Sequence, residues 1–100
     1  MSIFDALGDP ARRKILALLN NGEQPAGALV AALRLPQPNV SKHLKVLREA
    51  GLVRVRGDAQ RRLYSLDPAP LQELDQWLAP YRRFWAVKLD ALGDHLKRSD

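Results

Sequence analysis

The sequence has 100 residues and no cysteine. Disulfides, thiolate metal ligands and thiol nucleophiles are therefore excluded. Long apolar stretches are also missing, because the longest run without a charged residue covers residues 24–33, about half of what a bilayer requires. The first ten residues carry Asp5 and Asp9 and no basic residue, so they do not resemble a signal peptide. We expect a cytoplasmic protein without membrane contact.

Groups for catalysis or metal binding are scarce. The sequence contains two histidines, His43 and His95, and neither a glycine-rich phosphate loop nor a nucleophile elbow. Asp90, Asp94 and His95 come closest to a set of metal ligands, but the adjacent residues Asp94 and His95 would point about 100° apart on a helix. We interpret these three as solvated residues, and we expect no metal, no cofactor and no enzymatic activity.

Charge is plentiful and unevenly distributed. Lys and Arg number 16 against 11 Asp and Glu, which gives a net charge of +5. Residues 34–62 hold eight basic and two acidic residues, so this segment has a net charge of +6 and the remainder is nearly neutral. A solvated basic face would explain the segment, and so would an anionic partner such as nucleic acid.

The apolar spacing predicts helices in the first half of the chain. Asp9 and Pro10 suit the cap and first turn of a helix over about residues 9–20, preceded by a short apolar helix. Pro25 opens a second short helix. After the proline-containing break at residues 35–38, a third helix runs to about Ala50, where Gly51 ends it.

The periodicity changes after this third helix. The pattern predicts two strands, at residues 52–56 and 62–66, joined by a turn. It predicts a helix over residues 69–97, which Pro80 must bend or split. The predicted fold class is mainly α with a small β-hairpin. We expect a single winged helix-turn-helix domain over residues 1–100, including a long C-terminal dimerisation helix. Its core would span residues 9–66, with dimerisation helices at 1–8 and 69–97.

The third helix would expose a polar face. Its apolar stripe of Val40, Leu44 and Leu47 must be buried, which leaves the opposite side projecting. An α-helix fits the major groove of DNA, where Gln and Asn side chains can pair with adenine and Lys can reach guanine or phosphate. The hairpin would reach flanking phosphates or the minor groove. The expected DNA-binding residues are Gln37, Pro38, Asn39, Ser41, Lys42, His43, Lys45, Arg56, Arg61 and Arg62.

Two details stay open at this point. His43 lies nearer the buried side of the third helix than its exposed centre, so a phosphate contact and a packing role are equally consistent with the sequence. Arg12, Arg13 and Lys14 fit either a DNA contact from the preceding helix or a solvated face.

Two long motifs carry a family resemblance. Residues 4–16 read FDALGDPARRKIL, and residues 37–53 read QPNVSKHLKVLREAGLV. They resemble the N-terminal segment and the recognition helix of the ArsR/SmtB family of bacterial winged-helix repressors, over about residues 3–66. The C-terminal part, with Tyr81 to Trp85, is similar to the subgroup that lacks the cysteine metal box. The resemblance implies a homodimeric repressor that binds operator DNA. The sequence does not identify an inducer.

One position departs from the family pattern. Members commonly carry Ser before the Gln-Pro pair, where it caps the recognition helix, and this chain has Pro36 instead. The lost cap costs on the order of 1 kcal/mol. We expect the rigidity of the two prolines to define the start of the helix.

The C-terminal segment carries an apolar seam at alternating spacings of three and four residues, close to a heptad pattern. Packing within one chain would explain it, but we favour a dimer interface, which would also match the symmetry of an inverted-repeat operator. The expected interface residues are Ile3, Phe4, Leu7, Leu78, Tyr81, Trp85, Leu89 and Leu92.

Two functions compete on these grounds. The first is a sequence-specific DNA-binding transcriptional regulator, a dimeric repressor whose partners are double-stranded DNA and a second copy of the chain. The alternative is a winged-helix module that binds proteins and reads no DNA. The localised basic charge and the polar face of the third helix favour the first.

Overall fold

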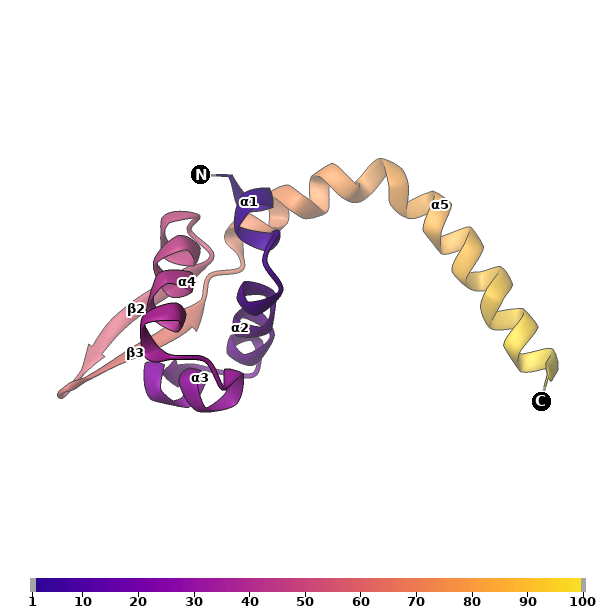
Figure 1. Cartoon of the computed structure of the whole chain (residues 1–100). Coiled ribbons are helices and arrows are strands. Elements are labelled where there is room, and N and C mark those ends of the chain that lie inside the picture. The colour runs from indigo at the N-terminus through magenta and orange to yellow at the C-terminus, as the bar shows by residue number, and fades with distance from the viewer. Residues whose placement is uncertain (1, 100) are drawn as a thin grey trace.

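The computed structural model describes the backbone of residues 2–99 and the side chains of residues 2–87 (Figure 1). It confirms the predicted fold class, mainly helical with a small antiparallel sheet. The elements in chain order are α1 (Ile3–Leu7), α2 (Pro10–Asn20), β1 (Gln24–Pro25), α3 (Ala26–Leu33), α4 (Gln37–Glu49), β2 (Val53–Asp58), β3 (Arg61–Leu66) and α5 (Ala69–Ser99).

The sheet contains one strand more than the expected hairpin. Its order is β1-β3-β2, with both pairings antiparallel. The strand β1 has only two residues, of which Gln24 lies opposite Tyr64 and Pro25 opposite Leu63. The hairpin is also tighter than expected, since Asp58 pairs with Arg61 and the turn has just two residues. We call β2, β3 and this turn the wing.

The core lies between α1 to α4 and the inner face of the sheet. The predicted stripe of α4 is buried, with Val40, Leu44 and Leu47 at most 2% exposed. Ile15 of α2 and Leu29 of α3 are equally buried in the same cluster. The burial of the stripe leaves the opposite side of α4 facing outward.

A side-chain cap and a glycine determine where two of the helices begin and end. The Asp9 carboxylate caps α2 by accepting the N–H groups of Ala11, at 2.7 Å, and Arg12, at 3.3 Å. At the other end of the helix-turn-helix, Gly51 adopts a φ of 77°, a left-handed conformation that favours glycine. The chain can therefore turn directly from α4 into the wing.

Arg12 and Arg13 hold α1 against α2. The Arg12 side chain donates to the carbonyl oxygens of Ala6, at 2.6 Å, and Asp5, at 3.0 Å. Arg13 donates to the carbonyl oxygen of Leu7 at 2.7 Å. These carbonyls lie at the C-terminal end of α1, where that of Asp5 also accepts the Gly8 N–H at 3.2 Å. The arginines therefore add hydrogen bonds to the carbonyls that the end of a helix leaves available.

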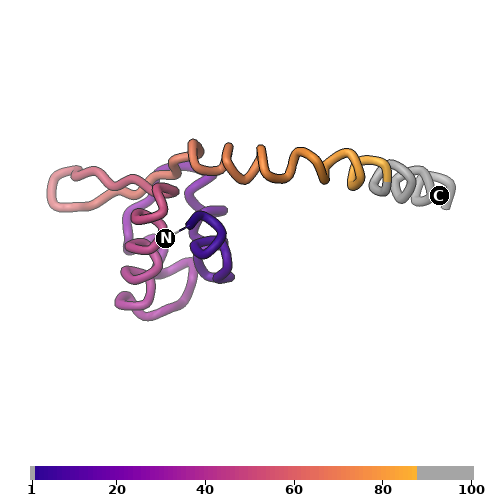
Figure 2. Tube along the Cα trace, turned by 90° about the horizontal axis from the view of Figure 1, so that it is seen from above, coloured from indigo at the N-terminus to yellow at the C-terminus, as the bar shows by residue number. Residues whose placement is uncertain are grey.

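The helix α5 leaves the body of the protein (Figures 1 and 2) and bends along its length (Figure 1). Its first turns carry Leu71 and Leu74, which pack against the core. Pro80 lies inside the helix, where it removes one backbone hydrogen bond and its ring crowds the preceding turn. Of the two arrangements expected, one bent helix is observed. Within the described part of the chain, no helix combines the length and apolar content needed to span a membrane.

Candidate nucleic-acid interface

The helix α4 begins with two prolines and no side-chain cap, as expected. Pro36 is the capping residue, and its carbonyl oxygen accepts the N–H groups of Asn39, at 3.0 Å, and Val40, at 3.2 Å. Pro38 needs no partner for a backbone N–H, because it has none. Six residues of the predicted DNA-binding set on α4 are exposed: Gln37, Pro38, Asn39, Ser41, Lys42 and Lys45.

The structure brings part of this set together with the wing. A hollow of about 540 Å³ lies between the start of α3, the first turns of α4 and the wing. Its lining includes Gln37 and Ser41 from α4, and Arg61 and Arg62 from β3. Two hydrogen-bonding side chains thus share one concave surface with two arginines that lie twenty or more positions away in the chain.

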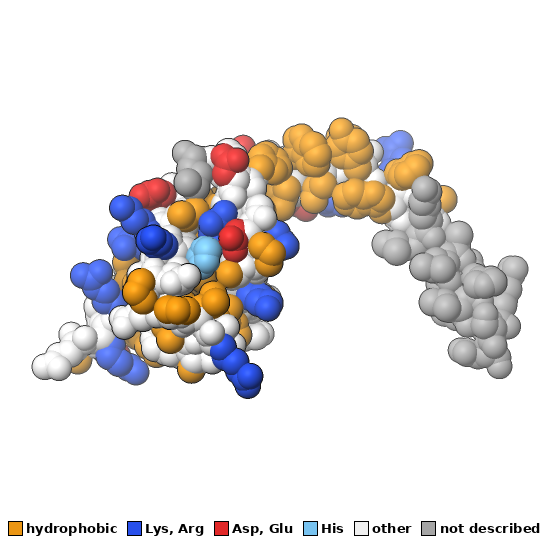
Figure 3. Space-filling model, in the orientation of Figure 1, with side chains coloured by type: hydrophobic (Ala, Val, Ile, Leu, Met, Phe, Trp, Pro, Cys, Tyr) orange, Lys and Arg blue, Asp and Glu red, His pale blue; other side chains and the backbone are white. Residues whose placement is uncertain are grey.

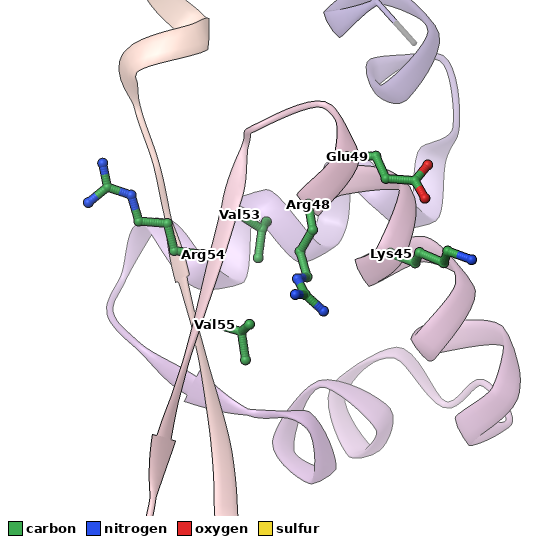
Figure 4. A pocket seen from close by; sticks show the side chains of 6 residues that line it. All are labelled: Lys45, Arg48, Glu49, Val53, Arg54 and Val55. Carbon is green, nitrogen blue, oxygen red and sulfur yellow. The ribbon is translucent and has the colours of Figure 1, made fainter.

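A second groove, lined by several cations, continues along the other half of α4. It is lined by Lys45, Arg48 and Glu49 of α4 and by Val53, Arg54 and Val55 of β2. Figure 4 shows the Arg48 side chain projecting into the space between α4 and β2, while Arg54 points away from it. Sequence reasoning missed Arg48. The available signal was its spacing, since residues 37, 41, 45 and 48 follow one ridge of a helix.

The basic residues differ in whether they are already paired. In the wing, Arg56 contacts Glu23 at 2.7 Å, Arg54 contacts Asp67 at 3.0 Å, and Arg61 contacts Asp58 at 3.0 Å. Among the side chains that the structure describes, four cations of this surface have no ion-pair partner: Lys42, Lys45, Arg48 and Arg62. These four are therefore the cations most available to an external anion.

The pair between Arg56 and Glu23 is bidentate. Arg56 Nε donates to Glu23 Oε2 at 2.8 Å, and Nη2 donates to Oε1 at 2.7 Å. This hydrogen bonding lowers the pKa of Glu23 and raises that of Arg56, because each charged group stabilises the charged form of the other. The expected DNA contact of Arg56 thus competes with a carboxylate in its own chain.

His43 lies on the side of α4 that approaches the start of α2. Its side chain is half-buried, unlike the exposed polar residues around it. Burial opposes ionisation of Asp9, but hydrogen bonds from the N–H groups of Ala11 and Arg12, together with the electrostatic influence of the His43 and Arg12 side chains, outweigh it and lower the Asp9 pKa. His43 is therefore close enough to the α2 cap to act on it electrostatically.

Comparison with known proteins decides the family. The family described as "Bacterial regulatory protein, arsR family" matches residues 9–55. The transcriptional repressor SdpR of Bacillus subtilis is 35% identical over 77 residues, covering 77% of this chain and 86% of that protein. This chain belongs to the ArsR family. It is accordingly a DNA-binding transcriptional regulator and not an enzyme.

Further ArsR-type relatives match most of the chain. The HTH-type transcriptional regulator Rv2034 of Mycobacterium tuberculosis is 38% identical over 95 residues, covering 91% of this chain and 89% of that protein. The crystal structure of an ArsR-like transcriptional regulator from Rhodococcus sp. RHA1 matches with a TM-score of 0.71 and 28% identity, covering 92% and 87% of the two chains. The match therefore includes part of α5 as well as the helix-turn-helix.

The residues expected at the dimer interface differ in how far they are exposed. Ile3 is only 5% exposed and belongs to the core of its own chain, while Leu7 and Leu78 are half-buried. Phe4, Tyr81 and Trp85 are between 45% and 50% exposed. The expected contacts of Leu89 and Leu92 lie outside the described side chains.

The exposed aromatic side chains extend from the body along α5. The ring centroids of Phe4 and Trp77 lie 5.7 Å apart in an edge-on arrangement, and those of Trp77 and Tyr81 lie 5.2 Å apart. Figure 3 shows hydrophobic side chains gathered along the described part of α5, whereas basic side chains gather on the winged-helix body. We call Phe4, Trp77, Tyr81, Phe84 and Trp85 the aromatic stripe.

Metal binding finds no support in the described region. There, no three His, Cys, Asp or Glu side chains come together in a group that could hold an ion. The weakly suggestive set of Asp90, Asp94 and His95 lies outside the described side chains.

Proposed function

We propose that this ArsR-family protein is a dimeric repressor that binds an inverted-repeat operator. One observation carries the proposal: Gln37 and Ser41 of α4 line the same hollow as Arg61 and Arg62 of the wing. Base-reading side chains and phosphate-binding side chains are needed side by side wherever a helix enters the major groove, because the phosphate backbone borders that groove.

The contacts divide by chemistry. Gln37 and Asn39 in the first turn of α4 would read adenine edges through paired hydrogen bonds. Lys42, Lys45 and Arg62 would bind phosphates, since their charges have no ion-pair partner among the described side chains. Such a regulator acts on chromosomal DNA, so we place it in the cytoplasm.

The dimer would form through the aromatic stripe on α5 and α1. Phe4, Trp77 and Tyr81 expose about half of their surface. Aromatic side chains of this size contribute strongly to protein interfaces, where each can bury roughly 150–250 Å². A two-fold axis through this stripe would present two α4 helices to two half-sites about one helical turn of DNA apart.

The decisive experiment measures binding to the DNA upstream of the protein's own gene at several salt concentrations. If six phosphates are neutralised, the logarithm of the association constant falls with the logarithm of salt concentration at a slope of about −5. A scrambled duplex should bind far more weakly at physiological salt. A flat salt response would instead favour the winged-helix module that binds proteins.

A further inference from the structure

The ion pair between Arg56 and Glu23 joins parts of the chain that are 33 positions apart. Arg56 lies in β2, towards the tip of the wing, and Glu23 lies just before β1, which leads directly into α3. The other two wing ion pairs connect different places. Arg61 and Asp58 flank the turn of the hairpin itself, and Arg54 reaches Asp67 at the base of the wing.

The register of the sheet places this pair on its outer face. Val55, Tyr64 and Gln24 lie opposite one another across the three strands, and Arg56, Leu63 and Pro25 form the next row. Directly opposite residues share a face, and successive residues alternate between faces. Since Val55 and Tyr64 pack with the core, Arg56 and Leu63 face outward.

Leu63 is nonetheless buried. It is 7% exposed, although it does not belong to the main core cluster. Arg56 and Pro25 flank it in its row, and the bonds from Arg56 to Glu23 cross the middle strand β3 from one edge of the sheet to the other. The charged pair thus spans the outer face of the sheet, where Leu63 is shielded from water.

We propose that Glu23 and Arg56 form a clamp that fixes the wing relative to α3 and α4, and that Arg56 serves DNA binding by positioning the wing. The inference rests on the proposed function. A two-stranded hairpin is only marginally ordered by itself, and β1 adds just two residue pairs to it. The clamp holds the Arg62-bearing strand beside the hollow that it shares with Gln37.

The first test is Glu23→Gln, because the two explanations predict opposite changes in the affinity for operator DNA. Removing a negative charge would strengthen operator binding if Arg56 were released to contact a phosphate. Loss of the clamp should instead weaken binding by about two- to fivefold, the factor that corresponds to an exposed ion pair. Asp58→Asn is the matched control: it removes the same charge and also breaks a wing ion pair, but one within the hairpin. It should leave binding equal or tighter.

The second test exchanges the two charges. Arg56→Glu alone should bind operator DNA most weakly, and the double variant Glu23→Arg with Arg56→Glu should recover most of the wild-type affinity, since the pair is restored and the net charge is unchanged. A double variant as weak as Arg56→Glu would assign Arg56 to direct phosphate contact and overturn the clamp.

A measurement without DNA separates the clamp from the proposed function. Amide hydrogen exchange of the β1–β3 pairing, at Gln24 and Tyr64, should be faster in Glu23→Gln than in the wild type, and unchanged in Asp58→Asn. Equal exchange in all three proteins would refute the clamp, whether or not the wild type binds an operator. Faster exchange in a protein that binds no operator would instead refute the proposed function alone.

Discussion

Gln37 and Lys45 lie on one ridge of α4, two turns apart, and differ in what they can recognise. The amide of Gln37 has a donor and an acceptor, which together match the edge of adenine. The ammonium group of Lys45 is a point charge that any phosphate satisfies. The proposed function therefore assigns sequence preference to the first residue and general affinity to the second.

Substituting each of these residues should separate the two contributions. Gln37→Ala should weaken operator binding by about 1–3 kcal/mol and leave binding to random DNA nearly unchanged. Lys45→Ala should weaken both and reduce the magnitude of the salt slope by about one. Anisotropy titrations with operator and scrambled duplexes would measure these effects. Parallel losses on both duplexes for both variants would contradict the assignment of base reading to Gln37.

Single residues also show where sequence reasoning ends. The exposed side of α4 followed from the spacing of Val40, Leu44 and Leu47, because a regular helix converts spacing into direction. The partner of Arg56 did not follow, since Glu23 is distant in sequence and meets it only through the sheet. For His43 the sequence left two roles open, and the structure places it half-buried, near the α2 cap.

Among the elements, the strongly periodic ones were predicted best. The bounds of α2 and α4 agree with the structure to within one or two residues, as do the starts of both wing strands. The strand β1 was missed because two residues carry no periodicity, and it exists only through pairing with β3. The tightness of the wing turn was also missed, since Ala59 adopts a φ of 57° that a non-glycine residue rarely takes.

The element α5 supports a prediction about assembly. Trp85 is 45% exposed in the single chain and belongs to the aromatic stripe. If the stripe is the dimer interface, Trp85→Ala should raise the dimer dissociation constant by about tenfold or more and weaken operator binding in parallel. Sedimentation equilibrium would measure the first effect. Glu73→Ala, an exposed position early in α5, should leave the dimer intact. If the Trp85→Ala variant dimerised as tightly as the wild type, the aromatic stripe would not be the dimer interface.

At the scale of the whole molecule, charge and apolar surface are separated along its length. The composition shows only a net excess of basic residues. In the structure, basic side chains gather on the body around α4 and the wing, and the exposed aromatic side chains continue along α5 (Figure 3). Because the basic surface and the aromatic stripe occupy different parts, a dimer formed through the stripe would leave the proposed DNA-binding surface free. The sequence predicted this division through the local +6 segment.

Global stability should fall in acid, because folding favours the charged form of three carboxylates. Asp9 caps α2, Glu23 forms the clamp with Arg56, and Asp67 accepts the Ala69 N–H and pairs with Arg54; the pKa of each is lowered in the folded protein. The stabilisation is complete above the ordinary pKa values, 3.8 for Asp and 4.5 for Glu, and is lost as pH falls through the lower folded values.

Substitutions at Asp9 test this linkage directly. Asparagine caps helices as well as aspartate but does not titrate, so Asp9→Asn should keep most of the stability at pH 7 and lose less of it between pH 5 and pH 3 than the wild type. Asp9→Ala removes the cap and should cost about 1 kcal/mol at pH 7. Urea unfolding at each pH would provide the free energies of unfolding. Parallel pH curves for Asp9→Asn and the wild type would show that the cap does not carry the acid sensitivity, which would then belong to Glu23 and Asp67.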